Sequence, residues 1–473
     1  MIATPQTKPE AVERIQSWLR EHEQELLEDY RAMLRIASIE GLEQPNAPFG
    51  QENRQALDLA LSLGKKFGMR TKDLDGFIGY AEIGSGPLVV SLGHLDVVPV
   101  GPGWKHDPFG AEIDEGYVYA RGAEDDKGPT MASFYAIRAI KECVPNLRAR
   151  LRQVFGCNEE SGFRCVHHYT QVEEPPALGI APDSMWPLVH AEKGIANLLV
   201  SVGLPSGKFA LLEVHGGQRP NIVIDSCEGK VRVDASIRKQ IDEKLSDAWD
   251  RNVTWDWDGD MLRVTAIGKA AHGSTPFYGD SAATRLFRFL LQITPFEEEK
   301  FYDELFYSTH PSGPGLGIHG LDDVSKDLTN NIGMVRTENG RIVMNFNVRY
   351  PVAWKGAQLR DKCLSYLDKL ECDWKLDSFT DSPSLYFSLD HPLVKTIVDV
   401  YKAETGEDKE PGVMGGGTYA RAIPNTVSIG TGWEGDGKAH ETDERMSIQN
   451  LYKMSRIYAR ILYEMVDLAA KGH

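Results

Sequence analysis

The 473-residue chain is long enough for two or three domains, and its 41% hydrophobic and 26% charged content is ordinary for a globular protein with a sizeable core. A formal net charge of −17 and a pI near 5.3 argue against nucleic acid or an anionic membrane as a partner, because both require a basic face. Six cysteines without paired spacing, and an amino terminus without the apolar core of a signal peptide, predict reduced thiols and a cytoplasmic location.

Helices and strands alternate in the first part of the chain. Apolar residues at helical spacing predict helices over residues 10–37, 53–67 and 128–142. Short apolar runs predict buried strands near residues 88–93, 151–157 and 179–181, and a histidine or carboxylates follow each of them. This recurrence is typical of an α/β domain with a mostly parallel sheet flanked by helices.

The pattern changes at residue 192. Antiparallel strands are predicted near residues 198–200, 210–214, 230–237, 261–267 and 342–348, with helices over 281–293 and 359–370. Alternating helices and strands return after residue 382 and end in a helix over 447–468. We therefore expect one α/β domain made of residues 1–191 and 382–473, interrupted by an inserted α+β domain over residues 192–381.

Polar side chains at the strand ends form a candidate site. Ligands of open α/β sheets bind beyond the carboxyl ends of the strands, where the chain offers metal-ligating side chains. The candidate ligands are His94, Asp125, Glu160, Asp183 and His440. Two histidines with several carboxylates suit Zn²⁺, Mn²⁺ or Co²⁺, and one carboxylate can bridge two ions about 3.5–4 Å apart.

Two further acids lie next to these ligands. Asp96 follows His94 by two residues, so the two side chains of an extended segment point the same way and can act together. Glu159 adjoins Glu160 and should point in a different direction, which makes it a candidate general base.

Several sequence blocks resemble the two-metal peptidase family of aminoacylase, carnosinase, glutamate carboxypeptidase and succinyl-diaminopimelate desuccinylase, and most of all its bacterial dipeptidase V branch. The likeness covers nearly the whole chain. Its motifs are Gly93-His94-Leu95-Asp96-Val97-Val98-Pro99, Arg121-Gly122-x-x-Asp125-Asp126-Lys127-Gly128, Asn158-Glu159-Glu160, Pro182-Asp183, Ala271-His272-Gly273-Ser274 and Ala439-His440-Glu441.

The resemblance implies two divalent ions per chain, zinc before manganese or cobalt. One ion would be held by His94, Asp125 and Asp183, and the other by Asp125, Glu160 and His440, with Asp125 as the bridge. The peptide bond between Asp125 and Asp126 would be cis, as it often is in the family.

The resemblance also assigns the neighbouring acids and the insert. Asp96 would orient His94, and Glu159 would act as the general base. The insert would be a lid, in which His272 polarises the scissile carbonyl and stabilises the oxyanion.

Further residues would contact the substrate. Asn221 and Arg349 resemble residues of the lid that bind it, and Arg349 is a natural partner for a carboxylate. The glycine run that includes Gly416 and Gly417 would form one wall of the cleft. Because the lid is nearly twice the family's short form, we expect an active site that a monomer can complete.

These implications lead to one prediction and two alternatives. We predict a metal-dependent dipeptidase that hydrolyses small unblocked peptides with a metal-activated water and a glutamate base. The first alternative is an amidohydrolase that removes an acyl group from an amino acid at the same metal site, since fold and ligands do not set the substrate. The second is a catalytically silent binding protein, against which the intact ligand set and Glu159 argue.

Overall fold

A computed structural model describes residues 8–437 and 439–472, and these residues form two compact units. The first unit comprises the chain up to His190, residues Phe387–Gly412, and the chain from Thr418 onward. The second comprises Ala191–Tyr386 together with Val413–Gly417.

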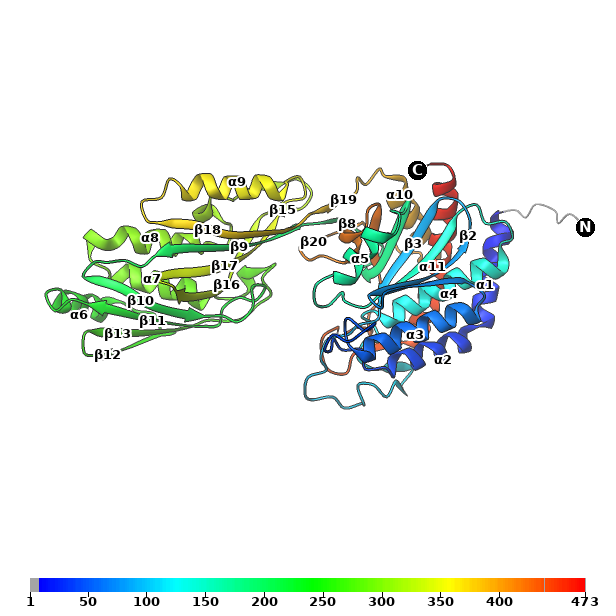
Figure 1. The fold of residues 1–473 in the computed structure, drawn as a ribbon, viewed down its shortest axis with the longest axis horizontal. Coiled ribbons are helices and arrows are strands. Elements are labelled where there is room, and N and C mark those ends of the chain that lie inside the picture. The colour runs from blue at the N-terminus through cyan, green and yellow to red at the C-terminus, as the bar shows by residue number, and fades with distance from the viewer. Residues whose placement is uncertain (1–7, 438, 473) are drawn as a thin grey trace, which may run out of the picture. The chain divides into compact units, whose positions relative to one another are not determined.

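A mixed sheet forms the centre of the first unit, with strand order β1-β2-β6-β3-β7-β21-β8 (Figure 1). Strands β6, β3, β7 and β21 run parallel to their neighbours in this order, whereas β1, β2 and β8 are antiparallel. The strands are β1 (Arg70–Leu74), β2 (Ile78–Gly84), β3 (Leu88–His94), β6 (Arg150–Gly156), β7 (Leu178–Ser184), β8 (Leu188–Glu192) and β21 (Thr426–Gly430). Two short strands, β19 (Leu385–Tyr386) and β20 (Gly412–Met414), fall wholly or mainly within the second unit. The predicted α/β class is confirmed, and the antiparallel edges are an addition that the sequence pattern did not reveal.

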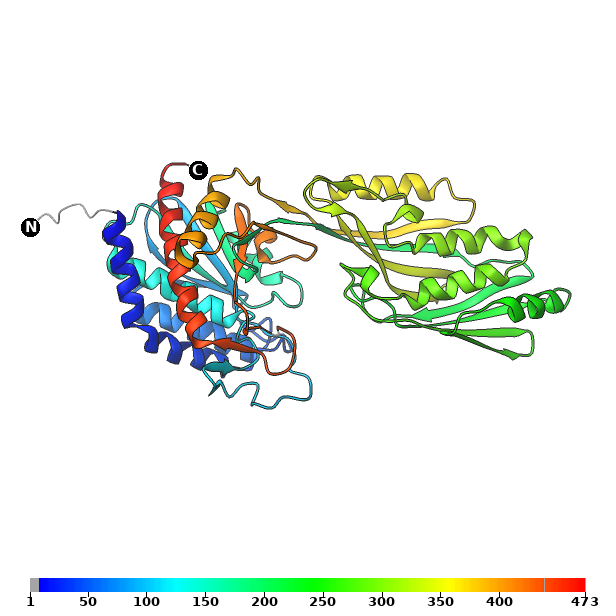
Figure 2. The ribbon, with the colours of Figure 1, turned by 180° about the vertical axis from the view of Figure 1, so that it is seen from behind.

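Helices flank this sheet. The long carboxyl-terminal helix α11 packs beside α4 and both contact β3, while α1 lies against the two helices (Figure 2). A small sheet, β22-β5-β4, lies in the same unit. The remaining elements are α1 (Lys8–Glu21), α2 (Glu23–Leu34), α3 (Gln51–Lys66), β4 (Glu112–Asp114), β5 (Tyr117–Tyr119), α4 (Lys127–Cys143), α5 (Arg164–Val172), α10 (Pro392–Thr405), a 3₁₀ turn at Tyr419–Ala422, β22 (Arg445–Ser447) and α11 (Ile448–Ala470).

Most predicted elements of this unit agree with the structure within a few residues. The main difference is the first helical stretch, which divides into α1 and α2 at His22. The imidazole Nδ1 of His22 bonds the main-chain oxygen of Trp18 at 2.7 Å, and its ring stacks on the Trp18 indole. Apolar spacing continues across His22, so the sequence pattern could not reveal the break.

The second unit is an antiparallel sheet with strand order β12-β13-β11-β10-β16-β17-β9-β18, and helices α7 and α9 pack on it. Its own apolar core includes Leu198, Phe287 and Phe346. Its elements are β9 (Gly194–Gly203), β10 (Phe209–Gly216), β11 (Ser226–Val233), α6 (Arg238–Asp247), β12 (Val253–Asp258), β13 (Met261–Ile267), α7 (Ala282–Ile293), α8 (Glu299–Ser308), β14 (Leu321–Asp322), β15 (Lys326–Asp327), β16 (Thr329–Glu338), β17 (Arg341–Tyr350), α9 (Gly356–Leu367) and β18 (Trp374–Ser382), with 3₁₀ turns at Pro276–Tyr278, Phe296–Glu298 and Pro314–Leu316.

The unit boundaries differ in detail from the expected ones. The main segment of the second unit runs from Ala191 to Tyr386, whereas the sequence pattern predicts limits of 192 and 381. It also takes Val413–Gly417, which the sequence pattern grouped with the first unit. Among the described residues, no helix has the length and apolar character needed to cross a bilayer.

A close approach between β3 and α4 depends on Gly93. A Cβ atom at this position would lie 1.9 Å from Thr130 Oγ1 and 2.7 Å from Asp126 Oδ2. The missing side chain lets Asp126 Oδ2 accept a hydrogen bond from the His94 N–H at 3.0 Å. Glycine therefore fixes how the end of β3 meets the beginning of α4.

We expect Gly93→Ala to lower the free energy of unfolding by about 1–3 kcal/mol, because the new methyl group overpacks this contact. Gly203→Ala is the control, since a Cβ there would meet Asp373 at an ordinary 3.6 Å. Urea unfolding of both variants measures the difference. Equal stability of the two variants would contradict the steric argument.

Candidate metal centre

The candidate ligands converge at the carboxyl ends of the parallel strands, as the sequence predicts. His94 is the last residue of β3, Glu160 follows β6, and Asp183 lies near the end of β7. Asp125 comes from the loop before α4, and His440 from the loop before β22. Parallel strands end at the same edge of a sheet, so residues far apart in the sequence meet there.

The carboxylate of Asp125 lies between the two imidazoles. Its Oδ1 is 3.0 Å from His94 Nε2, and its Oδ2 is 3.2 Å from His440 Nε2. His440 Nε2 also lies 3.1 Å from Glu160 Oε1. Each oxygen of Asp125 thus faces a different histidine, which is the arrangement that a bridging carboxylate requires. The Asp125–Asp126 peptide bond is cis, which confirms that expectation.

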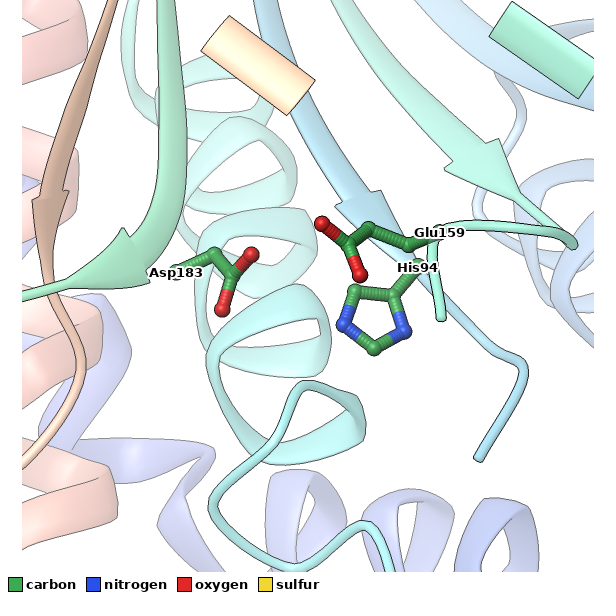
Figure 3. A group of neighbouring side chains, drawn as sticks. All are labelled: His94, Glu159 and Asp183. Atoms are coloured by element: carbon green, nitrogen blue, oxygen red, sulfur yellow. The ribbon is translucent and has the colours of Figure 1, made fainter. Parts of the chain in front are cut away.

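Potential ligand atoms form two overlapping groups. One joins His94, Glu159 and Asp183, and the other joins His94, Asp125 and Glu160, with the atoms of each group within 4.8 Å of one another. Figure 3 shows the carboxylates of Glu159 and Asp183 pointing toward one another on one side of the His94 ring. Glu159 and its neighbour Glu160 thus belong to different groups of ligand atoms.

Burial and mutual repulsion set the protonation of these carboxyl groups. Burial, followed by the charge of Asp183, raises the pKa of Glu159 well above its usual value. Burial, followed by the charge of Asp125, does the same to the pKa of Asp183. Burial opposes ionisation of Asp125 as well, but hydrogen bonds from His440 and His94 outweigh it and hold the pKa of Asp125 far below normal. Hydrogen bonds to Asp125 and Glu160 raise the pKa of His440 to about 10.

This electrostatic pattern tests whether the residues fit metal ions. Four carboxylates meet at the site, those of Asp125, Glu159, Glu160 and Asp183. Within residues 8–437 and 439–472, their ion-pair partners are His94 and His440 alone. Four buried or half-buried acids around two imidazoles favour cations at this position, because uncompensated buried charge is costly. Metal–ligand bonds of about 2 Å place two ligands of one ion within about 4 Å of each other, which matches the distances around Asp125. The donor set therefore fits divalent cations.

The main chain prepares His94 as a ligand. Its buried imidazole donates from Nδ1–H to the carbonyl oxygen of Asp96 at 2.9 Å. This bond keeps a proton on Nδ1, so Nε2, which faces Asp125 Oδ1 at 3.0 Å, is the nitrogen that would bind an ion after losing its own proton. The Asp96 carboxylate is less close, with 3.6 Å between its Oδ1 and Nδ1.

The Asp96 carboxylate instead holds the loop after β6. Its Oδ1 accepts the main-chain N–H of Glu159 at 3.1 Å, and its Oδ2 accepts that of Glu160 at 3.1 Å. Asp96 is buried, and its two oxygens thus fix two consecutive peptide groups. The carbonyl of Asp96 orients the histidine, while its carboxylate orients the two glutamates.

The residues proposed to bind substrate in the insert also form a group. His272 is exposed in a turn, where its Nδ1 accepts the N–H of Ser274 at 3.2 Å. Gly415 lies close to this turn, since a Cβ atom added to Gly415 would be 3.5 Å from the Ser274 Cβ. The main-chain oxygen of Gly415 accepts a hydrogen bond from Arg349 Nη1 at 3.0 Å. Partial loss of hydration around its ring, followed by the positive charge of Arg349, lowers the pKa of His272. The main-chain oxygen of the exposed Asn221 supports the turn, because it accepts the N–H of Gly273 at 2.7 Å.

Comparison with known proteins now identifies the family. Residues 90–464 match the model described as Peptidase family M20/M25/M40. The chain belongs to this family. Membership makes the protein a peptidase, and hence a hydrolase.

Two relatives of this M20/M25/M40 peptidase match along almost the whole chain. It is 37% identical over 460 residues to a Bacillus subtilis (strain 168) protein named "Putative dipeptidase YtjP", with 93% of this chain and 97% of that protein covered. It is 32% identical over 463 residues to a Staphylococcus epidermidis protein named "Putative dipeptidase", with 94% and 98% covered.

Solved structures share the fold. Human carnosine dipeptidase 1 has a TM-score of 0.54 and 15% identity, with 96% of this chain and 100% of that chain covered. The dipeptidase Dug1p from Saccharomyces cerevisiae has a TM-score of 0.55 and 15% identity, with 96% and 98% covered. At this identity the likeness concerns the fold, and it supports the α/β unit with an inserted α+β unit.

One residue of the M20/M25/M40 site was missed in the sequence. Glu444 is completely buried beside Asp125, and burial, followed by the charge of Asp125, raises the pKa of Glu444 to about 7. It lies in the acidic run after His440, where Glu441 is exposed. The sequence shows both acids, and only the folded structure shows which of them is buried.

Proposed function

We propose that the protein is a metal-dependent dipeptidase that hydrolyses small peptides with a free amino terminus. The observation that carries this proposal is the Asp125 carboxylate, whose two oxygens face His94 and His440 at 3.0 and 3.2 Å. The names of the two bacterial relatives support the choice of a dipeptide substrate.

In this proposal the ligands divide between two ions. His94, Asp125 and Asp183 would hold one, and Asp125, Glu160 and His440 would hold the other. Zinc suits two imidazoles with carboxylates best, and manganese and cobalt suit them as well. When bound, such ions lower the pKa of water and polarise a carbonyl group as Lewis acids.

Glu159 would move the proton. Cations bound at the site would offset the neighbouring negative charges and favour the ionised form of Glu159. Its carboxylate would then accept a proton from the water that attacks the scissile carbonyl carbon, and donate it to the nitrogen when the C–N bond breaks. Two features support this role: the hydrogen bond from the Glu159 N–H to Asp96, which fixes its main chain, and the position of its side chain beside His94.

His272 would stabilise the oxyanion as an inserted lid closes. Because Nδ1 of His272 accepts the Ser274 N–H, the neutral ring carries its proton on Nε2 and can donate it to the carbonyl oxygen. The lowered pKa of His272 keeps the ring neutral near pH 7.

Other groups of the same unit would bind the substrate. The Arg349 guanidinium would pair with the substrate carboxylate, and Asn221 would bind the peptide. Gly416 and Gly417 follow the carbonyl of Gly415 that Arg349 binds, and would form one wall of the cleft.

The setting that we propose is the cytoplasm, with an active site that one chain completes. All six cysteines lie within the described residues and are free thiols, which suits a reducing compartment. The length of the inserted unit, 191–386, supports a lid that needs no second subunit.

A substrate panel tests the function directly. After chelation, the protein should hold no ion and hydrolyse nothing, and added Zn²⁺, Mn²⁺ or Co²⁺ should restore up to two ions per chain together with cleavage of unblocked dipeptides. The panel includes β-alanyl dipeptides and N-acyl amino acids, and product amines and bound metal are both quantified.

Each outcome of the panel selects one reading. Preferential cleavage of N-acyl amino acids would replace the dipeptidase with an acyl-amino-acid hydrolase. Metal binding without hydrolysis of any compound would favour a silent binding protein. Full activity without metal would refute the proposed chemistry.

Glu159→Ala should reduce turnover by about 10²–10⁴-fold, because proton transfer is lost. Its metal content should stay near the wild-type value, measured by elemental analysis. Glu160→Ala is the comparison, since removal of a proposed ligand should lower metal content. If Glu159→Ala loses metal to the same extent, Glu159 is a ligand and not the base.

His272→Ala should lower kcat by about 10²–10³-fold, the usual cost of one oxyanion donor, and leave metal content unchanged. His310→Ala is a matched control. In the wild-type protein, Nδ1 of His310 accepts the N–H of Ser312 at 3.2 Å, just as Nδ1 of His272 accepts that of Ser274. Steady-state kinetics of the two variants measure the difference. Similar rates in both would deny His272 this role.

A further inference from the structure

Glu444 binds the loop that carries Asp125 at four points. Its Oε1 accepts the main-chain N–H groups of Glu124 and Asp125 at 2.9 and 3.1 Å. Its Oε2 accepts the N–H of Gly122 at 3.0 Å and Nη1 of Arg121 at 2.8 Å. One buried carboxylate therefore accepts donors from four residues within five consecutive positions.

Two further hydrogen bonds hold the same loop. The main-chain oxygen of Ala123, which lies between these donors, accepts a hydrogen bond from Tyr30 Oη at 2.9 Å. The main-chain oxygen of Glu444 accepts the N–H of Ala120 at 3.1 Å. The loop thus has few degrees of freedom left, and the Asp125 side chain leaves it in a fixed direction.

Stability alone is a weak reason for this arrangement. Glu444 and its counter-ion Arg121 are both buried, at 0% and 1% exposure. Buried ion pairs often stabilise a fold no better than apolar side chains do, because both charges lose their hydration. Here the pair also lies beside Asp125, a second negative charge, which makes the burial more costly. Such an arrangement is better explained by the geometry that it fixes.

Glu444 also connects two parts of the site. It follows His440 by four residues, so one short segment supplies both an imidazole facing Asp125 and the carboxylate that holds the Asp125 main chain. His440 has a φ of 65°, an uncommon value for a residue other than glycine, so its backbone conformation must be supported by neighbouring contacts. Arg445, the residue after Glu444, pairs with Gly437 and closes this segment.

We propose that Glu444 is a positioning residue, which sets the Asp125 carboxylate between His94 and His440 before any metal ion arrives. This inference rests on the proposed metal centre and adds a residue to it. Glu444 touches neither ion nor substrate and acts through the peptide groups of Gly122, Glu124 and Asp125. Its loss should therefore weaken metal binding.

The variant Glu444→Gln tests this. Glutamine keeps the size of the side chain but replaces one accepting oxygen with an NH₂ group, which must face N–H donors. Glu304→Gln is the matched control: in the second unit, the buried Glu304 carboxylate accepts the N–H groups of Glu371 and Cys372 at 3.1 and 3.4 Å and Trp374 Nε1 at 2.9 Å.

Co²⁺ is titrated into each metal-free protein, with the visible absorption spectrum and a competing chelator as readouts. We expect Glu444→Gln to lose about 10–100-fold in Co²⁺ affinity and to show an altered spectrum, as for other residues that orient ligands. Glu304→Gln should keep the wild-type affinity and spectrum. Wild-type affinity and spectrum in Glu444→Gln, or an equal loss in both variants, would overturn the inference. Failure of the wild-type protein to bind Co²⁺ would instead refute the proposed metal centre.

A second measurement needs no variant and applies if Glu444→Gln fails to fold. Hydrogen exchange in the metal-free wild-type protein reports the N–H groups of Gly122, Glu124 and Asp125 directly. If Glu444 holds the loop in advance, these amides are protected before metal is added, and metal increases their protection little. Rapid exchange of all three without metal, followed by strong protection on metal addition, would show that the ion orders the loop and overturn the inference.

Discussion

Three buried carboxylates, those of Asp96, Asp126 and Glu444, accept main-chain N–H groups from the segments that carry the candidate ligands. A carboxylate that binds peptide N–H groups forms hydrogen bonds worth about 1.5–3 kcal/mol each, stronger than those between neutral groups. Each bond fixes a peptide plane, and a peptide plane fixes where its side chain begins. The positions of His94, Asp125, Glu159 and Glu160 follow from these bonds.

This construction leaves a concentration of negative charge around the site. The positioning carboxylates lie close to carboxylates that would bind metal, and Arg121 is the arginine that pairs with Glu444. Burial, and after it the negative charge of a neighbouring acid, raises the pKa values of Asp183 and Glu159. Divalent cations relieve this repulsion, and a group that binds only the folded state stabilises it. Repulsion between these acids therefore destabilises the metal-free site and favours the binding of cations.

The sequence predicted which residues form this site better than it predicted the hydrogen bonds between them. His94 and Asp183 were predicted to meet because both lie at ends of parallel strands, and strand direction can be inferred from the alternation of helices and strands. The role of Glu444 could not be predicted, since its bond to Asp125 joins residues 319 positions apart in the chain. The Asp96 carboxylate was expected to orient His94, and only the folded structure shows the two glutamate N–H groups that it accepts.

The glycine run shows a similar limit at the level of domains. Composition grouped Val413–Gly417 with the surrounding α/β sequence, but the segment belongs with the second unit, where Arg349 binds the Gly415 carbonyl. A contact of this kind depends on a guanidinium from a distant strand, which no local pattern reveals.

The distribution of residues between the units separates two properties of the protein. All candidate metal ligands, and the carboxylates that position them, belong to the first unit, while His272 and Arg349 belong to the second. The second unit has its own apolar core, and none of the candidate metal ligands belongs to it. Within the first unit, by contrast, His440 and Glu444 come from the segment that precedes α11. Helix α11 packs beside α4, and α4 follows Asp125. The candidate metal ligands therefore come from both the early and the late part of the chain, and they meet only where the segment before α11 lies against the loop before α4.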